Sequence, residues 1–267
     1  MYGLIATDID DTLLAPDGTL PEANRAALRS LHDAGVAIVF CSGRADISIQ
    51  AIASSILPLV DDEYLISFNG ARVVTAATRR LLSRQYVTRD SVARIASYSR
   101  ENGLYLQGYR GDEFLVEYET KATKPYAEAT KTSYSIVEDM AQALPEGSPK
   151  LLLIGDHEIL AGHRDRLAAL DDSVRLVFSK PHYLEIIAAD VNKGRALTRL
   201  AAQLGIPVEE TVAVGDAAND AEMLRAAGLG IAVGNARREA REAAQVVLDT
   251  HAKDGAMAEV ARRFFGE

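Results

Sequence analysis

Three carboxylates follow a short apolar stretch near the start of the chain. In the segment LIATDIDDT, Asp8, Asp10 and Asp11 fall within four positions. Ionised carboxylates at this spacing repel one another, so we expect a positive partner, and Mg²⁺ suits these oxygen ligands best. An EF-hand is excluded, because its sixth and twelfth positions, counted from Asp8, are Leu13 and Thr19 instead of glycine and glutamate.

Two further groups of residues suit the binding of an anion. Ser42 and Gly43 follow an apolar run, where a hydroxyl and a backbone N–H can hold an anionic oxygen with Arg44 close by. Lys193 opens a predicted helix behind a candidate cap, Asn192. There a fixed cation adds to the positive end of the helix.

The fourth group is the segment GDAAND, in which Asp216 ends a predicted strand and Asn219 and Asp220 open the next helix. Taken singly, each of the four groups also fits an ordinary turn, a helix cap or a solvated side chain. Three of them, however, directly follow short buried strands, and the remaining group, that of Lys193, opens a helix. In a parallel sheet all four can converge on one edge, which predicts a single site there.

The elements that would position these groups alternate between strands and helices. Continuous apolar runs typical of a parallel sheet covered on both faces are separated by amphipathic segments. The Asn-Gly pair at 69–70 predicts a hairpin. The expected strands are residues 3–7, 36–41, 64–68, 72–75, 211–214, 230–233 and 246–248, and the expected helices are 21–34, 46–57, 194–204, 221–227 and 237–244.

Between these two parts the pattern changes to paired strands among helices, which is typical of an α+β domain. The sequence therefore predicts a doubly wound, mostly parallel, Rossmann-like α/β core at 1–84 and 188–267, with an inserted α+β cap domain at 85–187. The strands expected in the insert are residues 104–109, 113–118, 151–154, 174–178 and 183–188, and its helices are 91–102, 138–144 and 158–170.

Composition restricts the partners of the chain. The 267 residues include 29 Lys and Arg against 38 Asp and Glu, a formal charge of -9, which argues against nucleic acid or anionic membranes as partners. The single cysteine, Cys41, excludes an internal disulfide and favours a reducing, cytoplasmic setting. No apolar run approaches the ~20 residues of a membrane helix. The sequence does not indicate the oligomeric state.

These motifs resemble the haloacid dehalogenase-like phosphohydrolase superfamily. The resemblance extends over nearly the whole chain, and NGA at 69–71, LEI before NKG, and IAVGNA at 231–236 are similar to the Cof-type members of subclass IIB. In that subclass the large α+β cap lies between the serine and lysine motifs. The superfamily pattern of Asp-x-Asp-x-Thr, Ser or Thr, Lys, and Gly-Asp-x-x-Asn-Asp is met by Asp8, Asp10, Thr12, Ser42, Lys193, Gly215, Asp216, Asn219 and Asp220.

The resemblance implies a role for each motif. Asp8 would be the nucleophile that forms an aspartyl-phosphate, and Asp10 would protonate the leaving oxygen and then activate water. Mg²⁺ would be held by Asp8, the backbone carbonyl of Asp10, and Asp216. Asp11 is expected to be a turn or supporting residue.

The resemblance also implies which residues contact the phosphate. Asn219 would contact the phosphate or Ser42, and Asp220 would orient Lys193 or a metal-bound water. The expected phosphate-binding residues are Thr12, Ser42, Gly43, Lys193 and Asn219.

The leading interpretation is a phosphatase of small phosphomonoesters, such as sugar phosphates or similar metabolites. A phosphosugar mutase would share the same phosphoenzyme, and a phospholigand-binding protein would share the same residues. A phospho-receiver domain fits less well, because it is about half this length and carries aspartate where this chain has Ser42. The residues expected to set specificity are Arg44, Asn69, Lys180, His182 and Tyr183.

Overall fold

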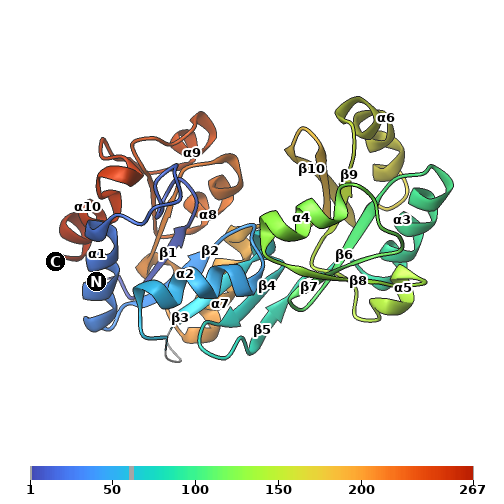
Figure 1. Cartoon of the computed structure of the whole chain (residues 1–267). Helices are drawn as coiled ribbons and strands as arrows, with labels where there is room; N and C mark the ends of the chain where they lie inside the picture. The colour runs from blue at the N-terminus through green and yellow to red at the C-terminus, as the bar shows by residue number, and fades with distance from the viewer. Residues whose placement is uncertain (1, 60–62, 267) are drawn as a thin grey trace. The chain divides into compact units, whose positions relative to one another are not determined.

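The computed structural model describes residues 2–59 and 63–266 and divides the chain into two compact units (Figure 1). Unit 1 is formed by the chain up to Arg84 and from Asn192 onward, and unit 2 by Gln85–Val191. Residues 188–191, which the sequence placed in the core, therefore belong to unit 2.

Unit 1 is built on an eight-stranded sheet in the order β14-β13-β12-β1-β2-β3-β4-β5, counted over the described residues. The pairs from β14 to β3 are parallel, and β4 and β5 are antiparallel, which confirms the mostly parallel core. The strands are β1 (Leu4–Asp8), β2 (Ala37–Cys41), β3 (Glu63–Ser67), β4 (Arg72–Thr75), β5 (Leu81–Arg84), β12 (Thr211–Gly215), β13 (Leu229–Ala232) and β14 (Val246–Val247).

Helices cover both faces of this sheet because its central strands are apolar on both sides. In β1, Ile5 packs into the cluster that contains α1, α2 and α10, whereas Leu4 and Ala6 pack into the cluster that contains α7, α8 and α9. The doubly wound arrangement is thereby confirmed. The helices are α1 (Glu22–Asp33), α2 (Asp46–Ile56), α7 (Lys193–Leu204), α8 (Ala221–Ala226), α9 (Arg238–Ala243) and α10 (Ala256–Val260).

Unit 2 is an α+β unit with a six-stranded sheet in the order β10-β11-β9-β6-β7-β8. One face packs on α3, α5 and α6, and the other carries polar side chains such as Gln107, with Tyr126 of α4 bonded to Tyr109. The elements are α3 (Arg89–Glu101), β6 (Leu106–Arg110), β7 (Glu113–Val116), α4 (Thr123–Thr130), β8 (Ser133–Ile136), α5 (Met140–Ala143), β9 (Leu151–Ile154), α6 (His157–Ala168), β10 (Val174–Lys180) and β11 (Tyr183–Ala188).

The hairpin predicted around Asn69 is confirmed, since β3 and β4 pair antiparallel. The turn between these strands is a 3₁₀ turn over Phe68–Gly70. The φ values of Phe68, Asn69 and Gly70 are 49°, 57° and 105°, so three successive residues are left-handed. No helix among the described residues is long and apolar enough to span a membrane.

Candidate active site

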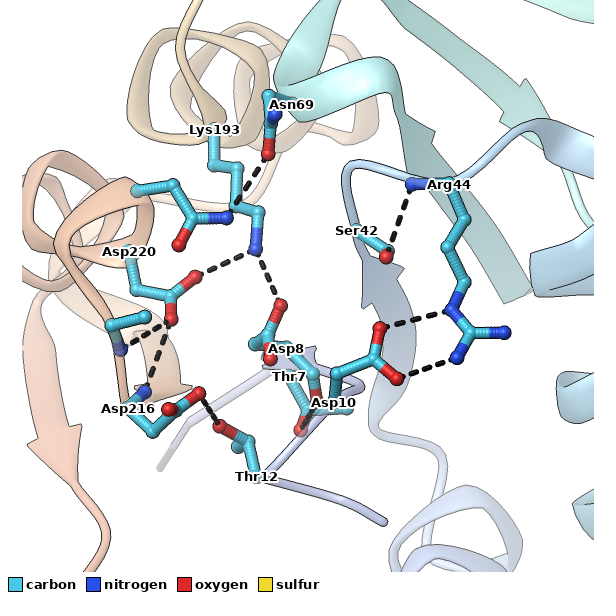
Figure 2. Close-up of polar contacts among 12 residues, drawn as sticks. Thr7, Asp8, Asp10, Thr12, Ser42, Arg44, Asn69, Lys193, Asp216 and Asp220 are labelled. Atoms are coloured by element: carbon cyan, nitrogen blue, oxygen red, sulfur yellow. Dashed lines mark hydrogen bonds and ion pairs between the residues drawn. The ribbon is translucent and has the colours of Figure 1, made fainter. Parts of the chain in front are cut away.

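The predicted polar groups of unit 1 lie together at the carboxyl edge of its sheet (Figure 2). Asp8 ends β1, Ser42 follows β2, and Asp216 follows β12. Because β12, β1 and β2 are neighbours in the sheet, parallel pairing brings these three positions together. Lys193, at the start of α7, completes the group.

Lys193 connects two of the motifs. Its side chain is fully buried, and its Nζ donates to Asp8 Oδ1 at 2.5 Å and to Asp220 Oδ1 at 2.6 Å. Burial alone would lower the pKa of Lys193, but the two carboxylates outweigh it and raise this pKa. The helix cap predicted at Asn192 is confirmed, because the Asn192 side chain accepts a hydrogen bond from the backbone N–H of Arg195 at 2.7 Å.

Asp220 is fixed from both sides. Its second oxygen, Oδ2, accepts bonds from the backbone N–H groups of Asp216 and Ala217, each at 3.0 Å. A Cβ on Gly215 would lie 2.5 Å from Asp220 Cβ, so this close approach requires glycine. Of the two roles considered for Asp220, the geometry favours orienting Lys193.

Asp8, Asp216 and Asp220 concentrate negative charge. One ligand oxygen from each lies within 4.8 Å of the other two, and all three side chains are buried. Burial, and then the charge of Asp220, hold the pKa of Asp8 well above its usual range. The same two causes raise the pKa of Asp216 to about 6. The cluster therefore carries more negative charge than Lys193 neutralises.

This donor set fits a hard divalent cation such as Mg²⁺. All three groups offer oxygen, which Mg²⁺ prefers, and the pKa values of Asp8 and Asp216 are raised by their burial and by the nearby charge of Asp220. Because Asp220 uses both oxygens within the protein, Asp8 and Asp216 are the better ligands. Thr12 donates to Asp216 Oδ1 at 2.9 Å. Thr12, which we had expected to contact the phosphate, thus positions the Asp216 carboxylate.

Asp10 is held apart from the buried cluster. Both of its oxygens accept from Arg44, with Nε at 2.9 Å and Nη2 at 2.6 Å. The pair is partly solvated, since 53% of the Asp10 side chain and 41% of the Arg44 side chain are exposed. Asp11 adopts a left-handed φ of 59°, which fits the turn expected there, and its carbonyl accepts from Asn235 Nδ2 at 2.7 Å. Sequence reasoning gave Asn235 no such role.

Asn69 joins the serine motif to the motif that contains Asn219. Asn219 Nδ2 donates to Asn69 Oδ1 at 3.1 Å, so Asn219 holds Asn69 and not Ser42. The backbone N–H of Asn69 donates to the Ser42 carbonyl at 3.0 Å. A Cβ on Gly43 would lie 3.1 Å from Asn69 Nδ2, which leaves little room for a side chain. Ser42 Oγ accepts from the backbone N–H of Arg44 at 3.2 Å.

Sequence reasoning missed the buried Asp46. Its carboxylate accepts a short hydrogen bond from the Ser67 hydroxyl and lies 3.0 Å from Arg72 Nη2. Ser67 and Arg72 flank the left-handed turn that carries Asn69, so Asp46 clamps both ends of this turn. An aspartate in the first turn of a helix reads as a capping residue, and no spacing rule links it to Arg72.

The remaining predicted residues lie in unit 2. Lys180 ends β10, Tyr183 begins β11, and His182 lies between these strands. The three side chains form one cluster: Lys180 Nζ is 5.3 Å from the Tyr183 ring centroid, and the His182 and Tyr183 ring centroids are 4.2 Å apart.

Comparison with known proteins gives a consistent family. Residues 5–260 match the model of the haloacid dehalogenase-like hydrolases. An HMP-PP phosphatase from Shigella flexneri serotype 5b is 32% identical over 244 residues, which cover 90% of this chain and 87% of that protein.

Two solved structures share the fold. A haloacid dehalogenase-like hydrolase from Bacteroides thetaiotaomicron is 25% identical, with a TM-score of 0.89 over 99% of this chain and 100% of the other. The subclass IIB sugar phosphatase BT4131, at 20% identity, has a TM-score of 0.76 over 98% of each chain. At that identity the second likeness concerns the fold alone.

Proposed function

The chain belongs to the haloacid dehalogenase-like hydrolase family and is a phosphatase, and on that premise we propose that it hydrolyses small phosphomonoesters through an aspartyl-phosphate. The observation that carries this proposal is the buried Asp8, held at 2.5 Å by Lys193 beside Asp216. Carboxylates placed around a fixed cation suit attack on phosphorus followed by release of the phosphate.

The residues would act in sequence. A carboxylate oxygen of Asp8 attacks phosphorus, the bond to the ester oxygen breaks, and that oxygen leaves with a proton from Asp10. Asp10 then takes a proton from water, whose oxygen attacks phosphorus and frees Asp8 with release of inorganic phosphate. Lys193 and the Ser42 hydroxyl steady the phosphoryl oxygens during both displacements. Asp220 keeps Lys193 aimed at Asp8.

Asp8, Asp216 and the backbone carbonyl of Asp10 would hold Mg²⁺, as the acidic cluster described above supports. When bound, this cation offsets the repulsion between the anionic nucleophile and the anionic phosphate. Thr12 would keep Asp216 in place through its hydrogen bond of 2.9 Å.

The proposal is tested by release of phosphate from a panel of esters, with Mg²⁺ and with EDTA. The panel includes sugar phosphates and HMP-PP, because a relative carries the name HMP-PP phosphatase. We expect metal-dependent turnover of at least one ester. If no ester is hydrolysed under either condition, the proposed function is wrong.

The roles of the two aspartates are tested by substitution. Asp8→Asn should abolish turnover and phosphoenzyme formation, and Asp10→Asn should lower turnover while leaving folding and Mg²⁺ binding intact. Asp11→Asn is the matched control, because asparagine tolerates the left-handed φ of 59° at this partly buried position. Full activity of Asp8→Asn would contradict its role as nucleophile.

We also propose that unit 2 acts as the cap that selects the leaving group. The cluster of Lys180, His182 and Tyr183 offers a cation, an imidazole and an aromatic face to a polar ligand. His182→Ala should raise KM for the best ester and leave KM for a minimal ester unchanged. An unchanged KM for both esters would remove His182 from the specificity residues.

A further inference from the structure

The pairing of Asp10 with Arg44 has a consequence for the choice of substrate. Arg44 occupies both carboxylate oxygens of Asp10, yet the proposed acid must turn one of these oxygens toward the leaving group. Asp10 must therefore exchange this partner before it can act. The exchange needs a second anion that Arg44 can bind in place of Asp10.

Arg44 is the accessible cation of the site. Among the ten residues labelled in Figure 2, the cations are Lys193 and Arg44, and they approach Asp8 and Asp10 from different sides. Lys193 is fully buried and already shared by two carboxylates. Arg44 is 41% exposed, and its partner Asp10 is 53% exposed, so an incoming anion can compete for it.

The guanidinium is also held in a defined orientation. Arg44 Nη1 donates to Ser48 Oγ of α2 at 3.3 Å, while Nε and Nη2 face Asp10. Asp46, two positions along the chain, is fixed by Ser67 and Arg72. The two N–H groups that hold Asp10 thus form a planar fork, which matches a carboxylate or phosphate equally well.

We propose that Arg44 binds a second anionic group of the substrate, next to the phosphoryl group that is transferred, and that this exchange releases Asp10. The inference rests on the proposed function and narrows its substrate class to phosphate esters that carry a further carboxylate or phosphate. Esters without a second anion leave Asp10 paired with Arg44.

Two matched pairs of compounds separate the possible sources of the anion. Phosphoglycolate and its neutral amide differ in one carboxylate, and methyl diphosphate and methyl phosphate differ in one phosphate. Each compound is tested for turnover with Mg²⁺ by the wild type, Arg44→Gln and Arg44→Lys. The binding of each compound is measured by calorimetry with proteins that also carry Asp8→Asn, because these proteins should not hydrolyse the compound.

Arg263→Gln is the matched control for the loss of charge. Arg263 is also 41% exposed and is also paired with a carboxylate, Glu259, at 2.7 Å. It lies in the C-terminal helical segment and contributes nothing to the proposed site. Thermal unfolding of all variants confirms that they fold.

For at least one pair, we expect the wild type to prefer the doubly anionic compound by about tenfold or more in kcat/KM, equivalent to about 1.4 kcal/mol. The Asp8→Asn protein with Arg44 unchanged should show the same preference in Kd. Arg44→Gln should reduce this preference to less than about twofold, and Arg44→Lys should retain part of it. The pair that responds identifies the second anion.

The inference is overturned if the wild type shows no preference in either pair, or if the preference survives in Arg44→Gln. Absence of turnover for every compound, together with Arg44-dependent preference in binding, would instead contradict the hydrolytic function and leave the anion site in place. The two failures are therefore distinguishable.

Discussion

Replacement of Lys193 by methionine tests the electrostatic account of the site most directly. The methionine side chain is similar in length to that of lysine, so Lys193→Met removes the charge and leaves little cavity. It also removes the two hydrogen bonds, of 2.5 and 2.6 Å, that the ammonium group donates to Asp8 and Asp220. Two buried carboxylates then face each other without a cation.

The expected cost follows from the burial of this group. Removing one partner of a buried ion pair typically costs 3–5 kcal/mol, because the remaining charge stays desolvated and unpaired. We expect Lys193→Met to lower the free energy of unfolding by about 3–5 kcal/mol at pH 7 in EDTA. Urea unfolding followed by circular dichroism measures this change. Excess Mg²⁺ should reduce the loss, since a divalent cation supplies the missing positive charge.

Lys150→Met is the matched control. Lys150 is also buried and lies 2.9 Å from Glu185, but in unit 2 and outside the carboxylate cluster. Its substitution should destabilise the protein equally with and without Mg²⁺. A loss below about 1 kcal/mol for Lys193→Met, or a loss that Mg²⁺ does not change, would refute the reasoning.

Three further predictions concern stability and metal binding. The pKa of Asp216 is about 6 in the folded protein against an ordinary 3.8, so the folded state holds a proton that the unfolded state has released. In EDTA, the stability of the wild type relative to Asp216→Asn should therefore fall by up to about 3 kcal/mol as pH rises from 4 to 7. Urea unfolding measures this difference, and a difference that does not change with pH contradicts the prediction. Mg²⁺ at 100 times its Kd should stabilise the wild type by about 2.7 kcal/mol and Asp216→Asn by much less, as thermal unfolding would show. Asp46→Asn removes the carboxylate that pairs with Arg72, and it should cost about 3 kcal/mol and lower kcat/KM at least tenfold by releasing Asn69. Arg238→Gln, which probes an exposed pair, should cost less than about 0.5 kcal/mol in the same assays.

The central architecture could be predicted because it depends on strong and local signals. Strands such as β1 and β2 are short apolar runs buried on both faces, and this pattern indicates a parallel sheet. The elements that were missed have weaker signals. The strands β5 and β8 each have four residues, lie at sheet edges and are largely exposed, while α4 contains Pro125 and has no side-chain cap.

Convergence of the site could be predicted, whereas the individual contacts could not. Spacing after a strand indicates that a residue reaches the sheet edge, but the hydrogen-bond partner there depends on side-chain geometry between distant segments. Thr12 bonds to Asp216, 204 positions away, and Asn219 bonds to Asn69, 150 positions away. The requirement for glycine at 215 likewise arises only once Asp220 folds back against the strand end.

Asp8 and Asp10 differ in solvent exposure, and this difference suits them to different chemical roles. Asp8 is buried beside Lys193, so its carboxylate is desolvated and oriented, as a nucleophile requires. Asp10, two positions later, is half exposed and paired with a cation that solvent can reach, so its partner can be exchanged. Asp10 can therefore turn from Arg44 toward the leaving group, while Asp8 remains the fixed point of attack.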